Sequence, residues 1–564
     1  MKGSISIKTI SFKNGTDLLL NEDSIVLFVG ANNSGKSLLL RELESCFLTN
    51  NSGEQSRALI SKIEGDKHGT YDDVLDNVKS RFNGGNQYSF PNGSGISLSD
   101  AQIKDFWQGD LSSYSSALAY PFFIKRLDTR DRLLLVDPPP RLSFGEQITN
   151  HPIQILQRDQ AKEVEFSKIF RKAFNKDAIV NHNGGQTLPI NVGERPESTK
   201  EHDRVSDKYS EELQKLGQLQ NQGDGMKAFA GVFLNLFATN FSINLIDEPE
   251  AFLHPPQARL LGEMLAKTLG TNKQLFISSH SEHFLKGILN TADSRLIVVR
   301  LLRNESGTRT TILDNDSLKK IWKEPLLKHS NILDGLFHSR VVLCESEGDS
   351  RFFSAIASSI VEDTDLSSPD IHFVQCGGKH QFPTAINALK KLDVPLTVIA
   401  DFDLLNNISP LREVFEALSG NWDKVKDDWK RVKEDIDAQR PELDAENLKK
   451  NIEEVLSKIT TNIVSDANIK ELESTIKKAS AWGVAKKLGK RYVRAGDATS
   501  CYIRIDEAFK QVKLIVLDVG EIECFDKTVG NHGPKWVNAV LEKDLKKSTE
   551  LNEAREFVSQ YILQ

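Results

Sequence analysis

Four acidic residues in the last third of the chain have the types and spacing of a divalent-metal site. Asp401 and Asp403 follow an apolar run, PLTVIA. Glu345 and Asp349 follow an earlier one, RVVLC. Converging carboxylates cannot all stay ionised without a counter-charge, and hard ions that prefer oxygen ligands, Mg²⁺ or Mn²⁺, supply it. Two such ions can activate a water molecule and stabilise the leaving oxygen in phosphodiester hydrolysis.

For these carboxylates to converge, the strands that precede them must end at one edge of a sheet. The sequence predicts a strand, acidic turn and helix over 338–360, a second strand and Gly-rich turn over 371–382, and a third strand over 395–405. This spacing is typical of a small parallel α/β sheet, whose ligand crevice lies beyond the carboxyl ends of the strands. Because residues i and i+2 of a strand face the same side, we expect Asp401 and Asp403 to point into that crevice.

A simpler interpretation exists for each acid taken alone. Most Asp and Glu residues are solvated or cap helices, and for Asp349 by itself a helix cap is the commoner role. Glu347 is a further candidate ligand, so the register of the acidic turn 345–349 stays open. Metal binding is the interpretation that accounts for the set.

A second constellation, near the start of the chain, predicts a nucleotide site. The apolar run IVLFV is followed by GANNSGKS and then by a helical pattern. Glycines let the loop backbone wrap around phosphate, at the positive end of the following helix. In this motif the Lys reaches the β- and γ-phosphates and the Ser hydroxyl ligates Mg²⁺. The predicted nucleotide-binding residues of this loop are Gly30, Asn33, Gly35, Lys36 and Ser37.

Two later segments complete that constellation. INLIDEPEAFLHPPQ predicts a buried strand that ends in Asp247, placed to hold the Mg²⁺ shell, and Glu248, placed to orient or deprotonate the attacking water. QLFISSHS predicts another strand that ends at His280, which could sense the γ-phosphate. Upstream, Asp224 and two glycines precede an apolar helix, the kind of helix start that binds anions.

A basic segment near residue 490 is a candidate nucleic-acid interface. Its five cations lie within nine positions, beside Trp482 and Tyr492, and are Lys486, Lys487, Lys490, Arg491 and Arg494. Clustered cations with aromatic neighbours suit a nucleic-acid backbone, and a solvated helix face is the equal alternative. The net charge of −7 leaves room for such a local patch.

Composition favours a cytoplasmic protein without a membrane partner. The 564 residues include no apolar stretch near the 20 or so residues that a transmembrane helix needs, and the N-terminus does not resemble a secretion signal. The five cysteines are scattered and form no CxxC pair, which fits a reducing compartment. A chain of this length is expected to form two or three domains.

The nucleotide motifs resemble those of ATPase heads of the ABC and structural-maintenance-of-chromosomes type. Lys36 and Ser37, Asp247 and Glu248, and His280 match that family's three motifs in order, while QGDGMK matches its signature segment loosely. The resemblance implies ATP with Mg²⁺ as the ligand. It also implies a homodimer, with two heads clamping two nucleotides.

The acidic motifs resemble a Toprim domain, in which Glu345 is the motif Glu and Asp401 and Asp403 form the DxD pair. An ATPase head followed by Toprim resembles the OLD (overcoming lysogenization defect) family of nucleases, including Gabija-type and retron-associated relatives. That resemblance makes Glu523 a further metal-side acid and Lys535 a cation that stabilises the pentavalent phosphate. Family partners include a helicase or a retron reverse transcriptase with its DNA, and a tetramer is a further option.

We therefore expect an α/β chain of two domains: an ABC-type ATPase over 1–330, interrupted at about 50–220, and a Toprim nuclease over 335–564, with a helical insertion at about 406–480. The expected function is ATP-regulated, metal-dependent DNA cleavage in bacterial defence against phage. The alternative is a chromosome-organising or DNA-repair ATPase without nuclease activity. A Toprim topoisomerase is disfavoured because no module with a tyrosine nucleophile is recognisable.

Overall fold

A computed structural model represents the chain. Its two compact units span residues 1–324 and 325–564. The residues that it describes are 3–48, 57–78, 87–89, 97–109, 122–142, 151–196, 206–239, 241–270, 272–291, 294–304, 307–313, 315–324, 331–362, 370–439, 445–459, 464–478 and 481–563.

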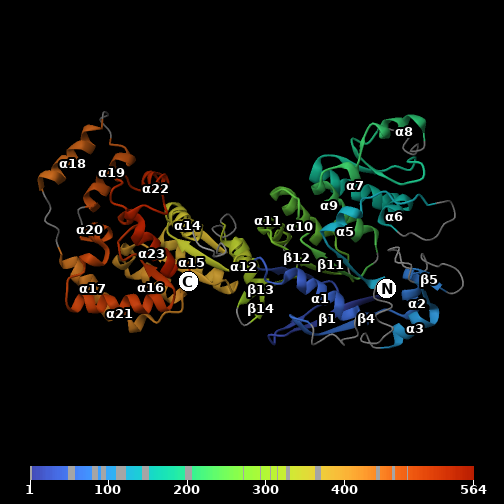
Figure 1. The fold of residues 1–564 in the computed structure, drawn as a ribbon, viewed down its shortest axis with the longest axis horizontal. Coiled ribbons are helices and arrows are strands. Elements are labelled where there is room, and N and C mark those ends of the chain that lie inside the picture. Colours follow the sequence, from blue (N-terminus) through green and yellow to red (C-terminus); the bar gives the residue numbers. More distant parts are fainter. Residues whose placement is uncertain are drawn as a thin grey trace. The chain divides into compact units, whose positions relative to one another are not determined.

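A six-stranded sheet forms the centre of the first unit (Figure 1). Its strands, in spatial order, are β14 (Gly307–Leu313), β13 (Leu296–Asn304), β3 (Ile25–Val29), β12 (Gln274–Ser278), β11 (Ile243–Asp247) and β7 (Ile124–Leu127). The pairings from β13 to β7 are parallel, whereas β14 is antiparallel to β13. Every residue of β3 and β12 is buried, as expected for parallel strands covered on both faces.

Helix α1 (Lys36–Leu48) packs between this sheet and a smaller antiparallel one. The smaller sheet contains β2 (Asp17–Leu19), β1 (Ser4–Phe12) and β4 (Ile60–His68), in that order. Leu39, Leu40 and Leu43 of the helix share one apolar core with Ile7 of β1 and Phe28 of β3. This packing fixes the N-terminus of α1 directly after the phosphate loop that follows β3.

Further helices cover the central sheet on the side away from α1 (Figure 1). They include α9 (Asp224–Ala238), α10 (Pro255–Thr268) and α11 (Glu282–Leu289), with α10 packed on α11 and α9 on α5 (Thr129–Leu134). The other elements of the unit are α2 (Tyr71–Val78), β5 (Gln87–Ser89), β6 (Ser97–Ser99), α3 (Asp100–Gln108), α6 (Pro152–Arg158), α7 (Gln160–Phe174), β8 (Asp177–Val180), β9 (Ile190–Gly193), α8 (Asp207–Gln214), β10 (Gly217–Gln218), η3 (Leu219–Asn221) and α12 (Asn315–Lys323).

The second unit is built on a fully parallel four-stranded sheet. Its order is β16 (Ile371–Gln375), β15 (Arg340–Cys344), β17 (Leu396–Ala400) and β18 (Leu514–Val516). Helices α14 (Glu347–Val361), α22 (Pro534–Leu541) and α23 (Asn552–Tyr561) form an apolar core with one face of the sheet, centred on the buried Trp536. The adjacent β15 and β17 are the two strands that precede the predicted carboxylates.

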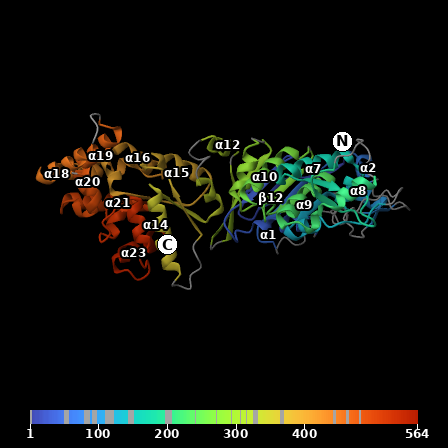
Figure 2. The same ribbon diagram turned by 90° about the horizontal axis from the view of Figure 1, so that it is seen from above.

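Residues 408–478, between β17 and β18, are mostly helical where the structure describes them, and α20 and α21 follow. In Figure 2 they form the orange part of the ribbon. Apart from α14, α22 and α23, the helices of the whole second unit are η4 (Ile332–Phe337), η5 (Lys379–Gln381), α15 (Phe382–Lys391), η6 (Phe402–Asn406), α16 (Ile408–Ala417), η7 (Trp422–Lys424), α17 (Lys426–Ala438), α18 (Ala445–Ser457), α19 (Asp466–Lys478), α20 (Ala481–Leu488), η8 (Gly489–Tyr492), α21 (Asp497–Gln511), η9 (Ile522–Phe525) and η10 (Thr549–Leu551). Helix α17 packs on α21, and α18 packs on α19. None of the described helices is both long enough and apolar enough to cross a membrane.

Candidate functional site

The phosphate loop joins β3 to α1 in a conformation that requires glycine. Gly30 and Gly35 have φ angles of 147° and 102°, and Asn33 also has a positive φ, 61°. A Cβ on Gly30 would lie 2.2 Å from the carbonyl oxygen of Leu301, so no side chain fits there. The Lys36 ammonium is buried and donates hydrogen bonds to the carbonyl oxygens of Gly30 (2.7 Å) and Ala31 (2.8 Å). The loop thus holds a cation where phosphate is expected.

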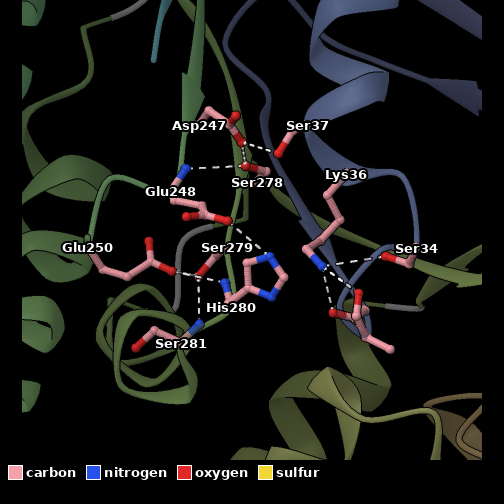
Figure 3. A network of polar contacts seen from close by, with 12 residues as sticks. Ser34, Lys36, Ser37, Asp247, Glu248, Glu250, Ser278, Ser279, His280 and Ser281 are labelled. Carbon is pink, nitrogen blue, oxygen red and sulfur yellow. Dashed lines mark hydrogen bonds and ion pairs between the residues drawn. The ribbon is translucent and has the colours of Figure 1, made fainter. Parts of the chain in front are cut away.

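The ends of β11 and β12 and the start of α1 bring three oxygen-bearing side chains together (Figure 3). The Ser37 hydroxyl donates to Asp247 Oδ1 at 2.9 Å, and the Ser278 hydroxyl donates to the same oxygen. Asp247 is paired with Ser278 in the parallel register of the two strands. A hydroxyl and a carboxylate in contact are suitable ligands for Mg²⁺ beside a nucleotide.

Glu248 and His280 form the next layer of this site. His280 Nε2 lies 3.0 Å from Glu248 Oε1, and this hydrogen bond is the main cause that holds the pKa of Glu248 below its usual range. Glu248 therefore favours its ionised form, which can accept a proton. Its backbone has a φ of 48°, in the left-handed region, and its N–H donates to the Ser278 carbonyl oxygen at 3.0 Å.

Two residues that the sequence did not indicate support this layer. Glu250 Oε1 accepts hydrogen bonds from the Ser279 hydroxyl (2.7 Å) and the His280 N–H (2.9 Å). Burial raises the pKa of Glu250. Arg132 lies 115 positions before Asp247 in the chain and contacts the backbone of Asp247 and Glu248. No local spacing connects Arg132 to the motif, so only the fold identifies it.

The signature-like segment forms the start of α9. Asp224 is the first residue of the helix and forms an ion pair with Lys227, in which Asp224 Oδ1 lies 2.7 Å from Lys227 Nζ. A Cβ on Gly225 would lie 2.7 Å from the carbonyl oxygen of Phe252, in the segment that follows Glu250. The helix start therefore packs against that segment, and the glycine permits the approach.

In the second unit, Glu345, Asp401 and Asp403 form a candidate metal-binding triad. Each residue offers a carboxylate oxygen, and the three oxygens lie within 4.8 Å of one another. The expectation that both aspartates belong to the strand is wrong: β17 ends at Ala400, Asp401 is the residue before η6 and Asp403 lies in the first turn of η6. The two side chains converge because the chain turns there, and alternation along a strand is not the cause.

The triad has unfilled bonding capacity. Glu345 Oε2 and Asp403 Oδ1 are buried and have no hydrogen-bond partner among the described residues. Buried carboxylate oxygens without partners are costly unless a cation binds there, so the residues present fit a divalent ion. Burial raises the pKa of Asp401 to about 8, and it also raises the pKa of Glu345.

Two lysine ammonium groups contact the triad. Lys379 Nζ lies 3.1 Å from Asp403 Oδ2, and Lys486 Nζ lies 2.8 Å from Asp401 Oδ2. Burial lowers the pKa of Lys486, but the carboxylates of Asp401 and Asp403 outweigh it, and the net shift is upward. Lys379 follows the Gly-rich turn after β16, and the sequence did not indicate it as a site residue.

Asp349 caps a helix, and its carboxylate is also close enough to other acids to be affected by their charge. Ser346 N–H donates to Asp349 Oδ2 at 2.8 Å, which with the reciprocal bond forms a capping box on α14. Burial raises the pKa of Asp349, and the charge of Glu523 adds to the shift. Glu347 is exposed in the same turn. Asp349 is outside the triad.

A second possible ligand group lies in the segment after β18. The ligand atoms of Glu521, Glu523 and His532 lie within 4.8 Å of one another. His532 Nδ1 is 2.8 Å from Glu523 Oε1, which also accepts a hydrogen bond from Gly533 N–H. Lys535 is exposed at the start of α22. Glu521 and His532 were not predicted, although Glu521 stands two residues before Glu523.

Both acidic groups open into one hollow of about 760 Å³. Its lining includes Asp403 of the triad, Glu521, Glu523 and His532 of the second group, and Lys486. Lys470 and Glu473 of α19, together with Trp482 and Gly483 of α20, lie on its wall. Acidic and basic side chains both line the hollow, and its volume is large enough to admit a phosphodiester.

The five predicted nucleic-acid contacts have different surroundings. Lys486 contacts the triad, Lys490 pairs with Asp518 at 2.7 Å and Arg494 lies 3.9 Å from Asp435. Lys487 and Arg491 are exposed, and Lys487 lies beside the hollow. The five cations therefore do not form one solvated helix face.

Comparison with known proteins defines the class. The family described as "AAA domain, putative AbiEii toxin, Type IV TA system" matches residues 25–286, and the family "Overcoming lysogenization defect protein-like, TOPRIM domain" matches residues 336–403. The chain therefore carries an AAA-type ATPase domain followed by an OLD-like Toprim domain, which confirms the resemblance to the OLD family.

One curated relative is the Old nuclease of Escherichia phage P2, 24% identical over 169 residues. That match covers 29% of this chain, which spans only 28% of the relative's length. Among solved structures, an Smc head bound to the C-winged helix domain of ScpA has 13% identity and a TM-score of 0.34, covering 56% of this chain and 99% of its own. The Smc head domain from Thermotoga maritima has 11% identity and a TM-score of 0.29, covering 56% and 100%.

Proposed function

We propose that the protein is a divalent-metal-dependent DNA endonuclease whose Toprim site hydrolyses phosphodiester bonds. The observation that carries the proposal is the gathering of Glu345, Asp401 and Asp403, from the ends of two strands, with buried oxygens that lack partners. The Toprim match at these residues and the nuclease named as a relative support the same reaction.

In this proposal the triad holds one ion, and Glu523 with Asp349 contributes to a second. Bound Mg²⁺ or Mn²⁺ would supply an activated water and stabilise the leaving oxygen. The protein's part is to fix the carboxylates at the end of the sheet and to keep them in a hollow that admits the DNA backbone. Lys535, exposed beside this region, is proposed to neutralise charge on the phosphate.

The nuclease is tested by incubating supercoiled plasmid with the full chain and Mg²⁺ or Mn²⁺. We expect wild type to cut, and Asp401→Asn to lose at least about 100-fold in rate, since metal-site removal abolishes the chemistry. Asp423→Asn is the matched control, because its carboxylate is 84% exposed on the same unit. Equal cutting by Asp401→Asn and wild type would refute the assignment, and ATP hydrolysis without cutting would favour the clamp-like ATPase.

We further propose that ATP with Mg²⁺ binds at the loop of Lys36 and controls the nuclease through a homodimer of heads. The contact between Ser37 and Asp247 and the ionised Glu248 beside His280 support ATP hydrolysis at this site. Glu248→Gln should bind ATP without hydrolysing it and accumulate as an ATP-bound dimer, detectable by light scattering. Lys36→Ala should stay monomeric in ATP. If wild type and both variants dimerise to the same extent, the proposal that ATP acts through a homodimer is contradicted.

A role in defence against phage is the biological setting that we propose, on the strength of the two family matches. Cells that express the chain should plate phage less efficiently than cells that express Asp401→Asn. Equal plating across a broad phage panel would argue against this role while leaving the biochemical proposal in place.

A further inference from the structure

Lys486 lies between the two acidic groups of the Toprim unit. Its ammonium is 2.8 Å from Asp401 Oδ2 in the triad and 3.7 Å from Glu521 Oε2 in the second group. Asp401 follows β17 and Glu521 follows β18, so one side chain from α20 connects carboxylates at the ends of two neighbouring strands.

The backbone of Lys486 is fixed against the segment that carries Glu521. A Cβ on Gly520 would lie 2.1 Å from the Lys486 carbonyl oxygen, and one on Gly489 would lie 1.9 Å from the Asp518 carbonyl oxygen. Both glycines have positive φ, 113° and 58°, and Lys490 N–H donates to the Asp518 carbonyl oxygen at 2.9 Å. Helix α20 therefore cannot shift along this segment without breaking close contacts, and the ammonium can leave the carboxylates only by a change of side-chain rotamer.

An ammonium and a divalent ion compete for the same ligands here. Asp401 Oδ2, the oxygen nearest to the lysine, belongs to a carboxylate that the triad needs for ion binding. A ligand that binds one state of a protein must first overcome the interactions that stabilise the other state. Mutual repulsion would otherwise separate these acids, so a built-in cation also keeps the site assembled before the ion arrives.

We propose that Lys486 is the internal counter-ion of the Toprim site: it holds the two acidic groups together without metal, and a divalent ion binds by displacing its ammonium. The inference deepens the proposed function and rests on it. Lys486 is thus a positioning residue that sets ion affinity, and its assignment as a DNA contact is replaced by this role.

The test is Mn²⁺ binding to the EDTA-stripped full chain without nucleotide, followed by the loss of the free-ion EPR signal. Asp401→Asn identifies the ion that belongs to the triad, because that ion disappears in this variant. Lys486→Met keeps the length of the side chain and removes its charge, and we expect the Kd for that ion to fall about tenfold, because no ammonium has to be displaced. Lys486→Arg, which keeps the charge, should stay within about threefold of wild type.

Lys430→Met is the control, since it removes the same charge from a lysine of the same unit whose side chain is 71% exposed. Its Kd should change by less than about twofold. A second readout is thermal unfolding: Lys486→Met should melt lower than wild type without ions and gain more from Mn²⁺. Unchanged or weaker Mn²⁺ binding in Lys486→Met would overturn the inference alone. If wild type and Lys486→Met both bind no more Mn²⁺ than Asp401→Asn, the proposed metal site itself fails.

Discussion

Arg132 Nη2 donates a 2.9 Å hydrogen bond to the backbone carbonyl oxygen of Glu248, the residue proposed to activate water in ATP hydrolysis. Nη1 of the same fully buried side chain donates to the carbonyl oxygen of Asp247. Glu248 has a left-handed backbone, a conformation that costs free energy in a residue with a side chain. The arginine therefore stabilises the strained turn that points Glu248 toward the nucleotide loop.

Replacing Arg132 should affect ATP hydrolysis more than ATP binding. Arg132→Met leaves the carbonyl oxygens of Asp247 and Glu248 without this donor, so we expect at least about a tenfold fall in kcat with the ATP Kd within about threefold. The variant should also lose about 2 kcal/mol of stability. Arg130→Met, on the exposed face of the same helix, is the control and should leave kcat unchanged. Normal turnover by Arg132→Met would show that the turn at Glu248 keeps its conformation without the arginine.

The glycine beside Lys486 gives a second prediction. In Gly520→Ala the new methyl would meet the Lys486 carbonyl oxygen at 2.1 Å, so α20 must move away and the Lys486 contact with Asp401 should weaken. Gly496 has nearly the same φ, 111° against 113°, but nothing lies within 4 Å of its Cβ.

Thermal unfolding of the two alanine variants separates steric contact from backbone strain. We expect a loss of about 1 kcal/mol for Gly496→Ala from strain, and at least about 3 kcal/mol for Gly520→Ala from strain plus overlap. Equal losses would mean that the close approach of α20 to Gly520 does not matter.

Asp349 allows its cap and its proposed ligand role to be separated. Asp349→Asn keeps an oxygen that can accept the Ser346 N–H but removes the negative charge. Stability should therefore change by less than about 0.5 kcal/mol, while plasmid cutting falls about tenfold if the charge helps to hold an ion. Asp349→Ala should lose the cap as well, at about 1 kcal/mol. Full cutting by Asp349→Asn would leave the residue as a cap and nothing more.

His151 should make the stability of the chain depend on pH. Burial lowers the pKa of His151 from 6.5 to about 4 in the folded protein, where Nδ1 accepts a hydrogen bond from Ile153 N–H. At a pH between these two pKa values, His151 binds a proton in the unfolded chain but not in the folded chain. The stabilisation is therefore present above about pH 6.5 and lost as the pH falls toward 4, by up to about 3 kcal/mol.

His151→Asn isolates this contribution, because its side-chain oxygen can accept the same hydrogen bond and does not titrate. The melting temperature of the variant relative to wild type should rise as the pH is lowered from 7.5 to 5. A difference that stays constant over this range would contradict the prediction.

Much of the site could be predicted because its chemistry is local in sequence. Gly30 to Ser37 are contiguous in sequence. Asp247 ends β11 and His280 follows the end of β12 by two residues, and the apolar pattern already marks both strands. Asp401 and Asp403 were placed together correctly but for the wrong reason, since the turn at η6 brings them together and not the alternation of β17. A two-residue spacing alone cannot distinguish these geometries.

The remaining site residues depend on contacts between distant segments. Arg132 meets Glu248 across 116 positions, and Lys486 meets Asp401 across an insertion that interrupts the Toprim pattern. A basic segment in sequence looks the same whether its lysines face solvent or neutralise acids in the fold. Lys379 and Glu521 were missed because a lysine after a glycine turn and a glutamate near another are too common to be informative.

The central claim is that acids from the ends of separate strands bind divalent ions in the Toprim unit. Anomalous diffraction from crystals of the full chain soaked in Mn²⁺ tests it most directly. We predict a peak bounded by Glu345, Asp401 and Asp403, with the Lys486 ammonium moved away from Asp401, and no such peak in Asp401→Asn crystals. Ordered wild-type carboxylates without a manganese peak, at an Mn²⁺ concentration that supports cutting, would contradict the account.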